Sequence, residues 1–258
     1  MNRTAVVTGS ASGIGRAVTD ALLARGDRVI GVDLRNADVL ADLSTTSGRA
    51  EAVAGVLAAA NGPVDVVVAC AGISGTSPAV VSVNFFGVVE LLEGLRSALA
   101  ASSAPRAAVV ASSVAVHASD AELDQACANL DEASARARVE VLSEQGHGHA
   151  VYPGSKAALA KWVRRIATTP QWAGAGIPLN AVAPGVVLTP MSAGLFEDPR
   201  MVAAMDQAVP MPLNGHQEPE VIADVLAFLV SPENSHVTGQ VVFADGGAEV
   251  LHRGSAQF

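Results

Sequence analysis

Short runs of β-branched and small apolar residues alternate with longer Ala- and Leu-rich segments along most of the chain. Each short run is typical of a strand buried on both faces, and each longer segment repeats apolar residues at helical spacing. Such a chain folds by packing parallel strands into one sheet, covering both faces with helices and joining them by right-handed crossovers. We therefore predict an α/β protein with a doubly wound parallel sheet, as a single domain over residues 1–258.

Five strand candidates have strong β-branched runs, and they lie at residues 4–8, 28–32, 64–70, 107–111 and 241–244. Two weaker candidates lie at residues 39–42 and 179–183. Helices are predicted near residues 14–25, 46–60, 80–101, 152–168 and 219–229.

Residues 115–150 interrupt this alternation, because they carry no strand pattern. Ser119-Asp120-Ala121-Glu122 matches a capping box that starts at Ser119. Apolar residues then recur at helical spacing, at Leu123, Ala126, Cys127, Leu130, Ala133 and Ala137. We predict a helical insertion with one apolar stripe.

Residues 191–213 hold four of the five methionines, Met191, Met201, Met205 and Met211, on a predicted helix flanked by loops. For any single Met, ordinary core packing is the alternative. Together they favour a mobile lid over a bulky apolar substrate, since Met adapts to irregular surfaces.

Composition excludes several functional classes. The 16 Lys and Arg residues against 25 Asp and Glu leave a net charge of −9, which argues against a nucleic-acid binder or a basic membrane-surface protein. The apolar runs stay well below the ~18 residues of a membrane span. Two cysteines, Cys70 and Cys127, build no disulfide framework. We expect a cytoplasmic protein whose partners are small molecules, with no membrane or nucleic-acid contact.

A glycine-rich turn follows the first predicted strand, with the sequence Thr8-Gly9-Ser10-Ala11-Ser12-Gly13-Ile14-Gly15. Gly9 permits a tight turn, while Gly13 and Gly15 let the backbone and helix N-terminus approach a pyrophosphate. Ser12 and Ile14 complete this candidate phosphate site. A plain strand-to-helix turn is the alternative interpretation.

Asp33, at the end of the second strand and 18 residues after Gly15, favours the nucleotide interpretation. A carboxylate there accepts hydrogen bonds from the adenosine ribose and repels a 2′-phosphate, which predicts NAD over NADP in a Rossmann-like site. Arg35 is the nearby group able to meet a phosphate instead. Asp42 and Leu43 are candidate adenine contacts, with a turn or N-cap role as the alternative for Asp42.

Tyr152 is the only tyrosine, and Lys156 is one of two lysines. Residues four apart share a helix face, so both side chains point the same way. An ammonium near a phenol favours the ionised form, which predicts a lowered pKa for Tyr152.

These motifs occur in an order that resembles the short-chain dehydrogenase/reductase family. They are TGSASGIG, CAG in place of the usual NNAG, VNFFG, SSVA, YPGSK and PGVVLTP, and they cover nearly the whole chain. The resemblance implies an NAD-dependent oxidoreductase that interconverts a secondary alcohol and its ketone, with Asn84, Ser113, Tyr152 and Lys156 as catalytic tetrad.

In that tetrad, the resemblance implies that Tyr152 exchanges a proton with the substrate oxygen and Ser113 hydrogen-bonds the same oxygen. Lys156 is implied to lower the phenol pKa and hold the nicotinamide ribose, and Asn84 to retain a water. Further implied cofactor contacts are Ala71, Gly72, Pro184, Gly185, Val187 and Thr189. Ser112 is interpreted as a buried serine at the strand end.

Departures from the usual family pattern indicate which branch of the family this chain resembles. The 39 residues from Ser113 to Tyr152 exceed the usual spacing. Cys70 replaces an Asn, and we expect Cys70 to be a small core residue and not a reactive thiol. The insertion and an Ala-Gln-Phe tail resemble the branch of bacterial 3α-hydroxysteroid dehydrogenases/carbonyl reductases. Enzymes of other cyclic or aromatic alcohols are the nearest alternative, and an idle NAD-sensing protein is the alternative from another class.

Two further expectations complete the prediction. The family resemblance implies a homo-oligomer, a dimer or tetramer, and we hypothesise that the insertion alters the usual subunit contact or makes its own. His147-Gly148-His149 has no third ligand partner in register, so we interpret it as a solvated loop and expect no metal site.

Overall fold

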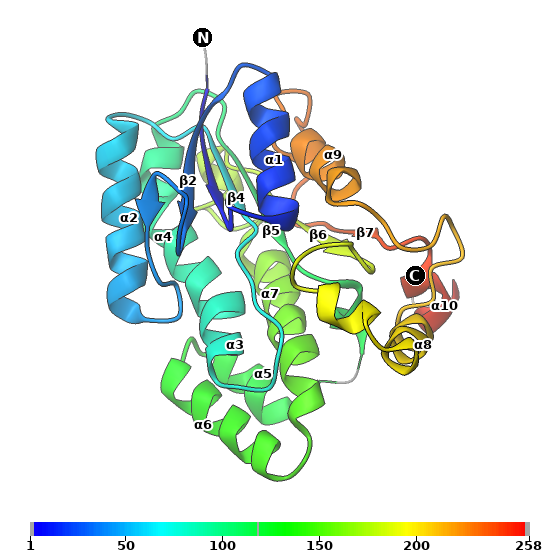
Figure 1. Ribbon diagram of the computed structural model, residues 1–258. Helices are drawn as coiled ribbons and strands as arrows, with labels where there is room; N and C mark the ends of the chain where they lie inside the picture. Colours follow the sequence, from blue (N-terminus) through cyan, green and yellow to red (C-terminus); the bar gives the residue numbers. More distant parts are fainter. Residues whose placement is uncertain (1–2, 118, 256–258) are drawn as a thin grey trace.

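A computed structural model of the chain describes residues 3–117 and 119–255, so the Ala-Gln-Phe tail lies outside the described residues. Seven parallel strands form one sheet in the order β3-β2-β1-β4-β5-β6-β7 (Figure 1). The strands are β1 (Thr4–Thr8), β2 (Arg28–Asp33), β3 (Val39–Leu40), β4 (Val66–Ala69), β5 (Arg106–Val110), β6 (Leu179–Pro184) and β7 (Val241–Ala244). The strand order reverses between β1 and β4, and ligands of such sheets bind at that crevice.

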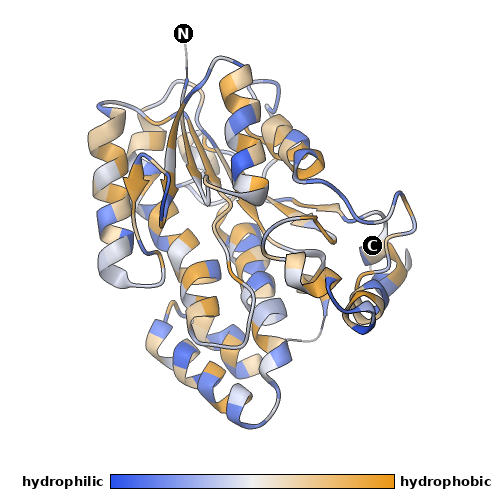
Figure 2. Cartoon of the chain, viewed as in Figure 1, coloured by the Kyte–Doolittle hydropathy of each residue, from blue (hydrophilic) through white to orange (hydrophobic). Residues whose placement is uncertain are grey.

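Helices cover both faces of the sheet. Two of them, α1 (Gly13–Ala24) and α9 (Pro219–Leu229), share an apolar cluster on one face. The other face packs against α2 (Thr46–Ala60), α4 (Val88–Ala100) and α7 (Val151–Ile166). Figure 2 shows the strands as an apolar layer between these helices. The predicted doubly wound α/β fold is confirmed.

All seven predicted strands are present, including the two weaker ones, and their ends shift by at most a few residues. The predicted helix over residues 80–101 is not continuous. It begins as α3 (Ala79–Val81), passes through a π-helical turn (Ser82–Gly87) and continues as α4. Such turns insert one residue into a helix and are common at functional sites. Asn84 lies within this turn.

The predicted insertion is helical, but it consists of two helices, α5 (Ala121–Ala128) and α6 (Glu132–Glu144). The predicted single stripe is wrong beyond Cys127, because Leu130 has a φ of +58° and turns the chain. As a result Ala133 and Ala137 are exposed. Helix α6 instead buries Ala135, Val139 and Leu142.

The predicted helix start is also wrong by one residue. Asp120 caps α5, since its Oδ1 accepts a hydrogen bond from the Leu123 N–H at 2.8 Å. Ser119 donates its hydroxyl to Asp124 instead. An Asp carboxylate is as good a cap as Ser and adds charge at the positive helix end.

Several contacts join the insertion to the rest of the domain. Arg49 of α2, which is only 1% exposed, binds Glu90 of α4 and Glu132 of α6. In addition, Gly154 of α7 lies against Leu123, and a Cβ there would come within 3.0 Å of the Leu123 side chain. The insertion therefore packs directly on the helix that holds Tyr152 and Lys156.

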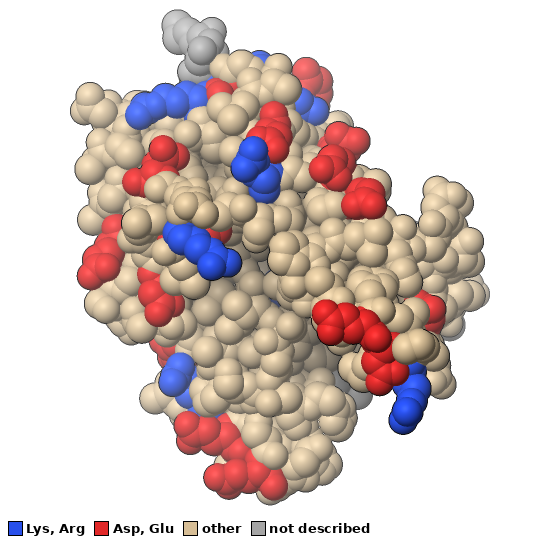
Figure 3. Space-filling model, viewed as in Figure 1, with Lys and Arg blue, Asp and Glu red and all other residues tan. Residues whose placement is uncertain are grey.

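Two short helices lie near the C-terminal edge of the sheet, α8 (Pro199–Ala208) and α10 (Ala248–Arg253). The helix predicted within residues 191–213 is thus α8, whereas α10, six residues long, was not predicted. In the described part of the chain, none of the helices is long and apolar enough to cross a membrane. On the face in Figure 3, the Lys and Arg side chains stand in separate small groups with acidic side chains between them.

Candidate active site

A cavity of about 460 Å³ opens at the carboxyl ends of the strands. Its volume is within the range of small-molecule sites. Every residue predicted to contact the cofactor lines it, from Gly9 after β1 to Thr189 after β6. Of the predicted tetrad, Ser113, Tyr152 and Lys156 line it as well, while Asn84 lies behind the wall.

The glycine turn has the geometry of a phosphate cradle. Gly9 and Gly13 have φ values of +69° and +51°, which favour glycine. A Cβ on Gly15 would lie 2.1 Å from the Gly9 carbonyl oxygen, so the turn closes only without that side chain. No side chain caps the N-terminus of α1, although Ser12 occupies the N-cap. The free N–H groups at the N-terminus of α1 therefore face the cavity and fit an anionic pyrophosphate.

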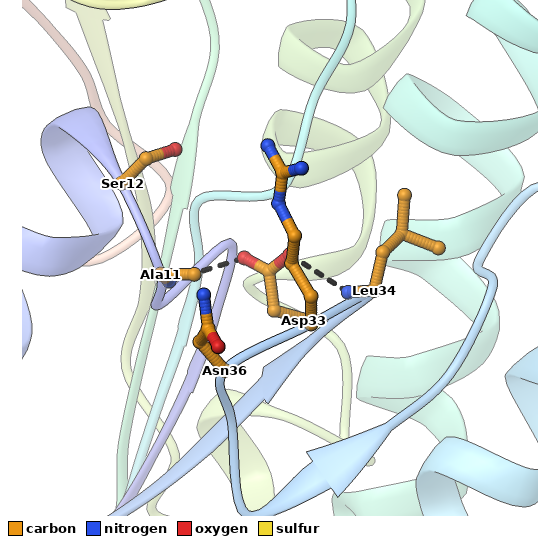
Figure 4. Close-up of a pocket in the computed structure, with 6 residues that line it drawn as sticks. Ala11, Ser12, Asp33, Leu34 and Asn36 are labelled. Atoms are coloured by element: carbon orange, nitrogen blue, oxygen red, sulfur yellow. Dashed lines mark hydrogen bonds between the residues drawn. The ribbon is translucent and has the colours of Figure 1, made fainter.

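Asp33 marks the adenosine end of the cavity (Figure 4). Its Oδ2 accepts a hydrogen bond from the Ala11 N–H at 3.1 Å, and its Oδ1 accepts one from Leu34 at 2.7 Å. These two bonds hold the carboxylate beside Ser12 and Asn36, in the position predicted to meet the ribose hydroxyls. A carboxylate acceptor at this position fits the hydroxyls of an unphosphorylated ribose.

Asp42 and Leu43 lie in the wall of the same cavity. Asp42 Oδ1 accepts a hydrogen bond from the Ser44 N–H at 2.9 Å, and its hydrogen bonds with Ser44 lower the pKa of the carboxyl. The N-cap of α2 is Thr45. Asp42 therefore shapes the turn before α2, as its alternative interpretation predicted, while it also borders the cavity.

The first two turns of α7 present Tyr152 and Lys156 to the cavity. Lys156 Nζ donates to the carbonyl oxygen of Val110 at 2.8 Å, at the end of β5. Only 3% of Lys156 is exposed, and burial lowers the pKa of its ammonium to about 8. Burial also raises the pKa of the Tyr152 phenol, and a hydrogen bond with Ser112 opposes this rise. The predicted direction of the Tyr152 shift is therefore wrong, because desolvation disfavours the phenolate.

Two adjacent serines end β5 and reach the same place. Ser112 is buried, as predicted, and its hydroxyl lies close enough to the Tyr152 phenol to oppose the rise in the phenol pKa. Ser113 Oγ is buried and has no hydrogen-bond partner among the described residues. A buried hydroxyl without a partner is costly in a folded protein, which indicates a ligand group as its partner. A substrate oxygen fits that position.

Asn84 holds the loop that begins at Gly72. Its amide accepts from the Ile73 N–H at 2.8 Å and donates to the Ile73 carbonyl at 2.9 Å. It also donates to Ser155 Oγ at 3.1 Å, which ties the π-helical turn to α7. A Cβ on Gly72 would lie 3.2 Å from Asn84 Oδ1 and 3.4 Å from Lys156 Nζ. Asn84 and Lys156 thus flank one small space beneath Gly72.

Cys70 lies in the cavity wall. Burial raises the pKa of its thiol to about 12, so the thiol stays protonated and is a weak nucleophile, as predicted. The backbone after it is fixed by Thr8, whose Oγ1 accepts a hydrogen bond from the Ala71 N–H at 3.0 Å. This bond orders the CAG segment without an Asn side chain.

The segment after β6 packs against the glycine turn. A Cβ on Gly13 would lie 3.2 Å from the Thr189 methyl group, so turn and segment nearly touch. Ser192, which sequence reasoning missed, donates its hydroxyl to the Val187 carbonyl at 2.6 Å and accepts from the Thr189 N–H at 3.0 Å. An isolated Ser in a loop gives no periodic or motif signal, so only the fold reveals this contact.

The four methionines of residues 191–213 have different environments. Met191 and Met205 line the cavity. Met201 lies outside the cavity lining with 46% of its surface exposed, and Met211 accepts a hydrogen bond from the Val186 N–H through its sulfur. Only two of them are therefore placed to touch a substrate.

Comparison with known proteins agrees with this geometry. A family model described as enoyl-(acyl carrier protein) reductase matches residues 9–249. The 3α-hydroxysteroid dehydrogenase/carbonyl reductase of Comamonas testosteroni is 41% identical, over 96% of this chain and 97% of its own. The chain belongs to the short-chain dehydrogenase/reductase family. It is therefore an oxidoreductase, and the predicted family is confirmed.

Other members of the short-chain dehydrogenase/reductase family match over the full length. The cis-4-hydroxycyclohexanecarboxylate dehydrogenase of Sinomonas cyclohexanicum is 32% identical, over 95% of this chain and 96% of its own. The crystal structure of the 3α-hydroxysteroid dehydrogenase from Pseudomonas sp. B-0831 complexed with NADH superposes with a TM-score of 0.89. That structure is 42% identical and covers 98% of this chain and 99% of its own.

The lowered pKa of Lys156 predicts a specific dependence of stability on pH. Between the folded pKa of about 8 and the ordinary lysine value near ~10.4, the unfolded chain binds more protons than the folded chain. The free energy of unfolding should therefore rise with pH across this window, by up to about 1.4 kcal/mol per pH unit from this group.

Denaturant unfolding of wild type and Lys156→Met at pH 7.5 and 9.5 isolates this contribution. We expect the free energy of unfolding of the wild type, relative to that of Lys156→Met, to be larger at pH 9.5 than at pH 7.5. The exposed second lysine provides the matched control, Lys161→Met, whose difference from wild type should stay constant. A constant difference for Lys156→Met as well would contradict the lowered pKa.

Proposed function

We propose that this protein is an NAD(H)-dependent 3α-hydroxysteroid dehydrogenase/carbonyl reductase. The observation that carries the proposal is the meeting of three groups in one cavity: the Tyr152 phenol, the unpartnered Ser113 hydroxyl and the Lys156 ammonium. Asp33 and the glycine turn lie at the nucleotide end of that cavity. The Comamonas and Pseudomonas proteins, which are named for this activity, support the substrate class.

The bound cofactor would supply or accept the hydride. In the reducing direction, Tyr152 donates its phenolic proton to the ketone oxygen, and Ser113 donates a hydrogen bond to the same oxygen. Burial raises the pKa of Tyr152, which keeps the phenol protonated at neutral pH and ready to donate. Lys156, held by the Val110 carbonyl, lies on the same helix face and would hold the nicotinamide ribose.

Cofactor orientation would come from the backbone of the segment after β6. Val187 and Thr189, which we propose as the carboxamide clamp, are fixed by the Ser192 hydroxyl. Asn84, through its two bonds to Ile73, would fix the loop above Lys156. Fixed positions matter because most of a dehydrogenase's contribution is placement of the reacting groups.

The walls of the substrate end favour a bulky apolar alcohol. The side chains that line this end are mainly aliphatic or thioether groups, from Val114, Met191, Leu195, Met205 and Val209. A fused ring system buries its apolar surface well in such a site, with polar groups only where the hydroxyl binds. Other cyclic alcohols remain the nearest alternative, and the Sinomonas relative supports that class.

Spectrophotometry of NADH formation tests the proposal. Protein mixed with NAD and androsterone, a 3α-hydroxysteroid, should form NADH, with cyclohexanols and aromatic alcohols as comparison substrates. Turnover of a cyclic or aromatic alcohol but not of the steroid would replace the substrate class. Tight NAD binding with no turnover of any alcohol would favour the idle NAD-sensing protein.

We also propose a homo-oligomer, as the family resemblance implies, and a location in the cytoplasm, as predicted from the composition. The insertion is linked to α4 through Arg49 and packs on α7 at Gly154, so it would alter a subunit contact made by those helices. The Comamonas relative is a dehydrogenase of small molecules, which supports a small-molecule substrate as the partner of this protein.

The lid proposal predicts unequal effects of two methionines on one helix. Met205→Ala should raise the KM for androsterone by roughly 3- to 10-fold, the effect of losing part of a buried apolar contact. Met201→Ala is the matched control, because its side chain lies outside the cavity lining, and should change KM by less than about twofold. Steady-state kinetics measure both, and equal effects of the two variants would contradict the lid assignment.

A further inference from the structure

Helix α8 has little buried surface to hold it in place. It contains no buried residue, and its main apolar contact is Met205. Met205 packs into a small cluster that includes Val209, Ala248 of α10 and Val114. An element with so few buried contacts opens easily unless polar contacts hold its ends. Asp198 only caps the helix itself, by accepting a hydrogen bond from the Arg200 N–H at 2.9 Å, whereas Asp206 on the side of the helix binds His216 at 2.7 Å.

Two histidines meet at the C-terminal end of α8, and one of them bonds its last carbonyl. His252 Nε2 lies 2.9 Å from the carbonyl oxygen of Ala208, the last residue of the helix. A carbonyl only accepts hydrogen bonds, so this ring nitrogen carries the hydrogen. His117 approaches the same Ala208 backbone, and this contact opposes the lowering of the His117 pKa. The two rings meet edge to face, with centroids 5.0 Å apart and planes at 80°.

These histidines come from distant parts of the chain. His117 follows directly on the 3₁₀ turn Ser113–Val116, whose first residue is the proposed substrate-binding serine. His252 belongs to α10, which lies beside α8 near the end of the chain (Figure 1). The pair therefore connects the serine turn, the C-terminal helix and the end of α8.

The state of the rings suits a shared acceptor. Burial lowers the pKa of His117, and the neighbouring His252 lowers it further, so the His117 ring is neutral at pH 7. A neutral imidazole has one N–H, which it can donate to the carbonyl without adding a positive charge beside His252. Both donors also complement the negative end of α8.

We propose that His117 and His252 are positioning residues that hold α8 closed over the substrate cavity. By fixing the Ala208 carbonyl, they keep Met205 in the cavity wall and couple the position of the lid to the turn that carries Ser113. This inference deepens the proposed function, because it rests on α8 acting as the lid of the alcohol site.

Hydrogen exchange measured by mass spectrometry tests the contact without reference to activity. In His252→Ala, amides of residues 199–208 should exchange faster by roughly 3- to 10-fold, as expected for the loss of one hydrogen bond. His252→Gln should restore most of the protection, since its amide N–H reaches the same acceptor. His236→Ala is the matched control, because His236 is exposed and bonds only its neighbour Ser235 at 2.8 Å.

Steady-state kinetics with NAD and androsterone provide the second measurement. His252→Ala should raise the KM for androsterone by roughly 3- to 10-fold and leave kcat within about twofold, because the chemical groups are untouched. His252→Gln should recover the KM. Unchanged exchange of α8 in His252→Ala would overturn the proposal, and so would faster exchange with an unchanged KM.

Failure of the proposed function has a different signature. Wild-type protein that binds NAD but turns over neither steroids nor other alcohols would contradict the proposed function. The exchange experiment still decides the contact in that case: faster exchange of residues 199–208 in His252→Ala supports it, and unchanged exchange overturns it.

Discussion

Replacing Tyr152 with Phe is expected to lower kcat for androsterone oxidation by roughly 10²- to 10⁴-fold, the range for loss of a general acid–base group. The chain contains a single tyrosine, so no other phenol can take over. Phe keeps the ring that packs against the core and removes only the hydroxyl that bonds Ser112. Initial rates of NADH formation measure the loss.

The Tyr152→Phe variant needs evidence that binding is intact. NAD affinity, measured by tryptophan fluorescence quenching, should change by no more than a few-fold, since the glycine turn and Asp33 are unaltered. The circular dichroism spectrum should match that of the wild type. A variant that folds, binds NAD and retains more than about a tenth of wild-type kcat would contradict Tyr152 as the acid–base group.

Replacing Asp33 with Ala is expected to reduce the preference for NAD over NADP by roughly 10- to 100-fold in kcat/KM. Two terms contribute: the ribose hydroxyls lose their acceptor, and a 2′-phosphate no longer meets a like charge. The Ala11 and Leu34 N–H groups that now bind the carboxylate would be free to face that phosphate. Kinetics with both cofactors at fixed androsterone give the ratio.

Arg35 provides the internal control for this prediction. It is exposed and borders the Asp33 pocket, so in the Asp33→Ala background it can attract the phosphate. Adding Arg35→Ala should reverse most of the gain with NADP and leave the rate with NAD nearly unchanged. A wild-type protein that prefers NADP would show that Asp33 does not set the cofactor choice.

Much of the fold follows from local sequence patterns. The seven strands were predictable because β-branched runs bounded by Gly, Asp or Ser have few other stable conformations in a buried sheet. The glycine turn was predictable for a similar reason, since Gly9 and Gly13 adopt backbone angles that other residues avoid. The cofactor-binding residues then converge because parallel strands end at one edge.

Errors arose where a single backbone conformation or contact that the apolar pattern does not record decided the outcome. The apolar spacing from Leu123 to Ala137 suggested one helix, but a left-handed residue at Leu130 split it and changed the buried face of the second half. Likewise, Ser112 and Ser113 are identical in type and adjacent. Only the packing of α7 against the end of β5 determines which hydroxyl meets Tyr152 and which stays without a partner.

The sequence by itself determined the sheet, the phosphate turn, the acid at the ribose position and the Tyr152–Lys156 pair. Each of these depends on backbone conformation or on spacing along one element, which short segments encode. Tertiary structure alone decided the directions of the pKa shifts and the π-helical turn at Asn84 that divides the predicted helix. It also decided that His117 and His252 meet near Ala208. Those features depend on burial and on contacts between residues far apart in the chain, and no local pattern records which distant groups will share a space.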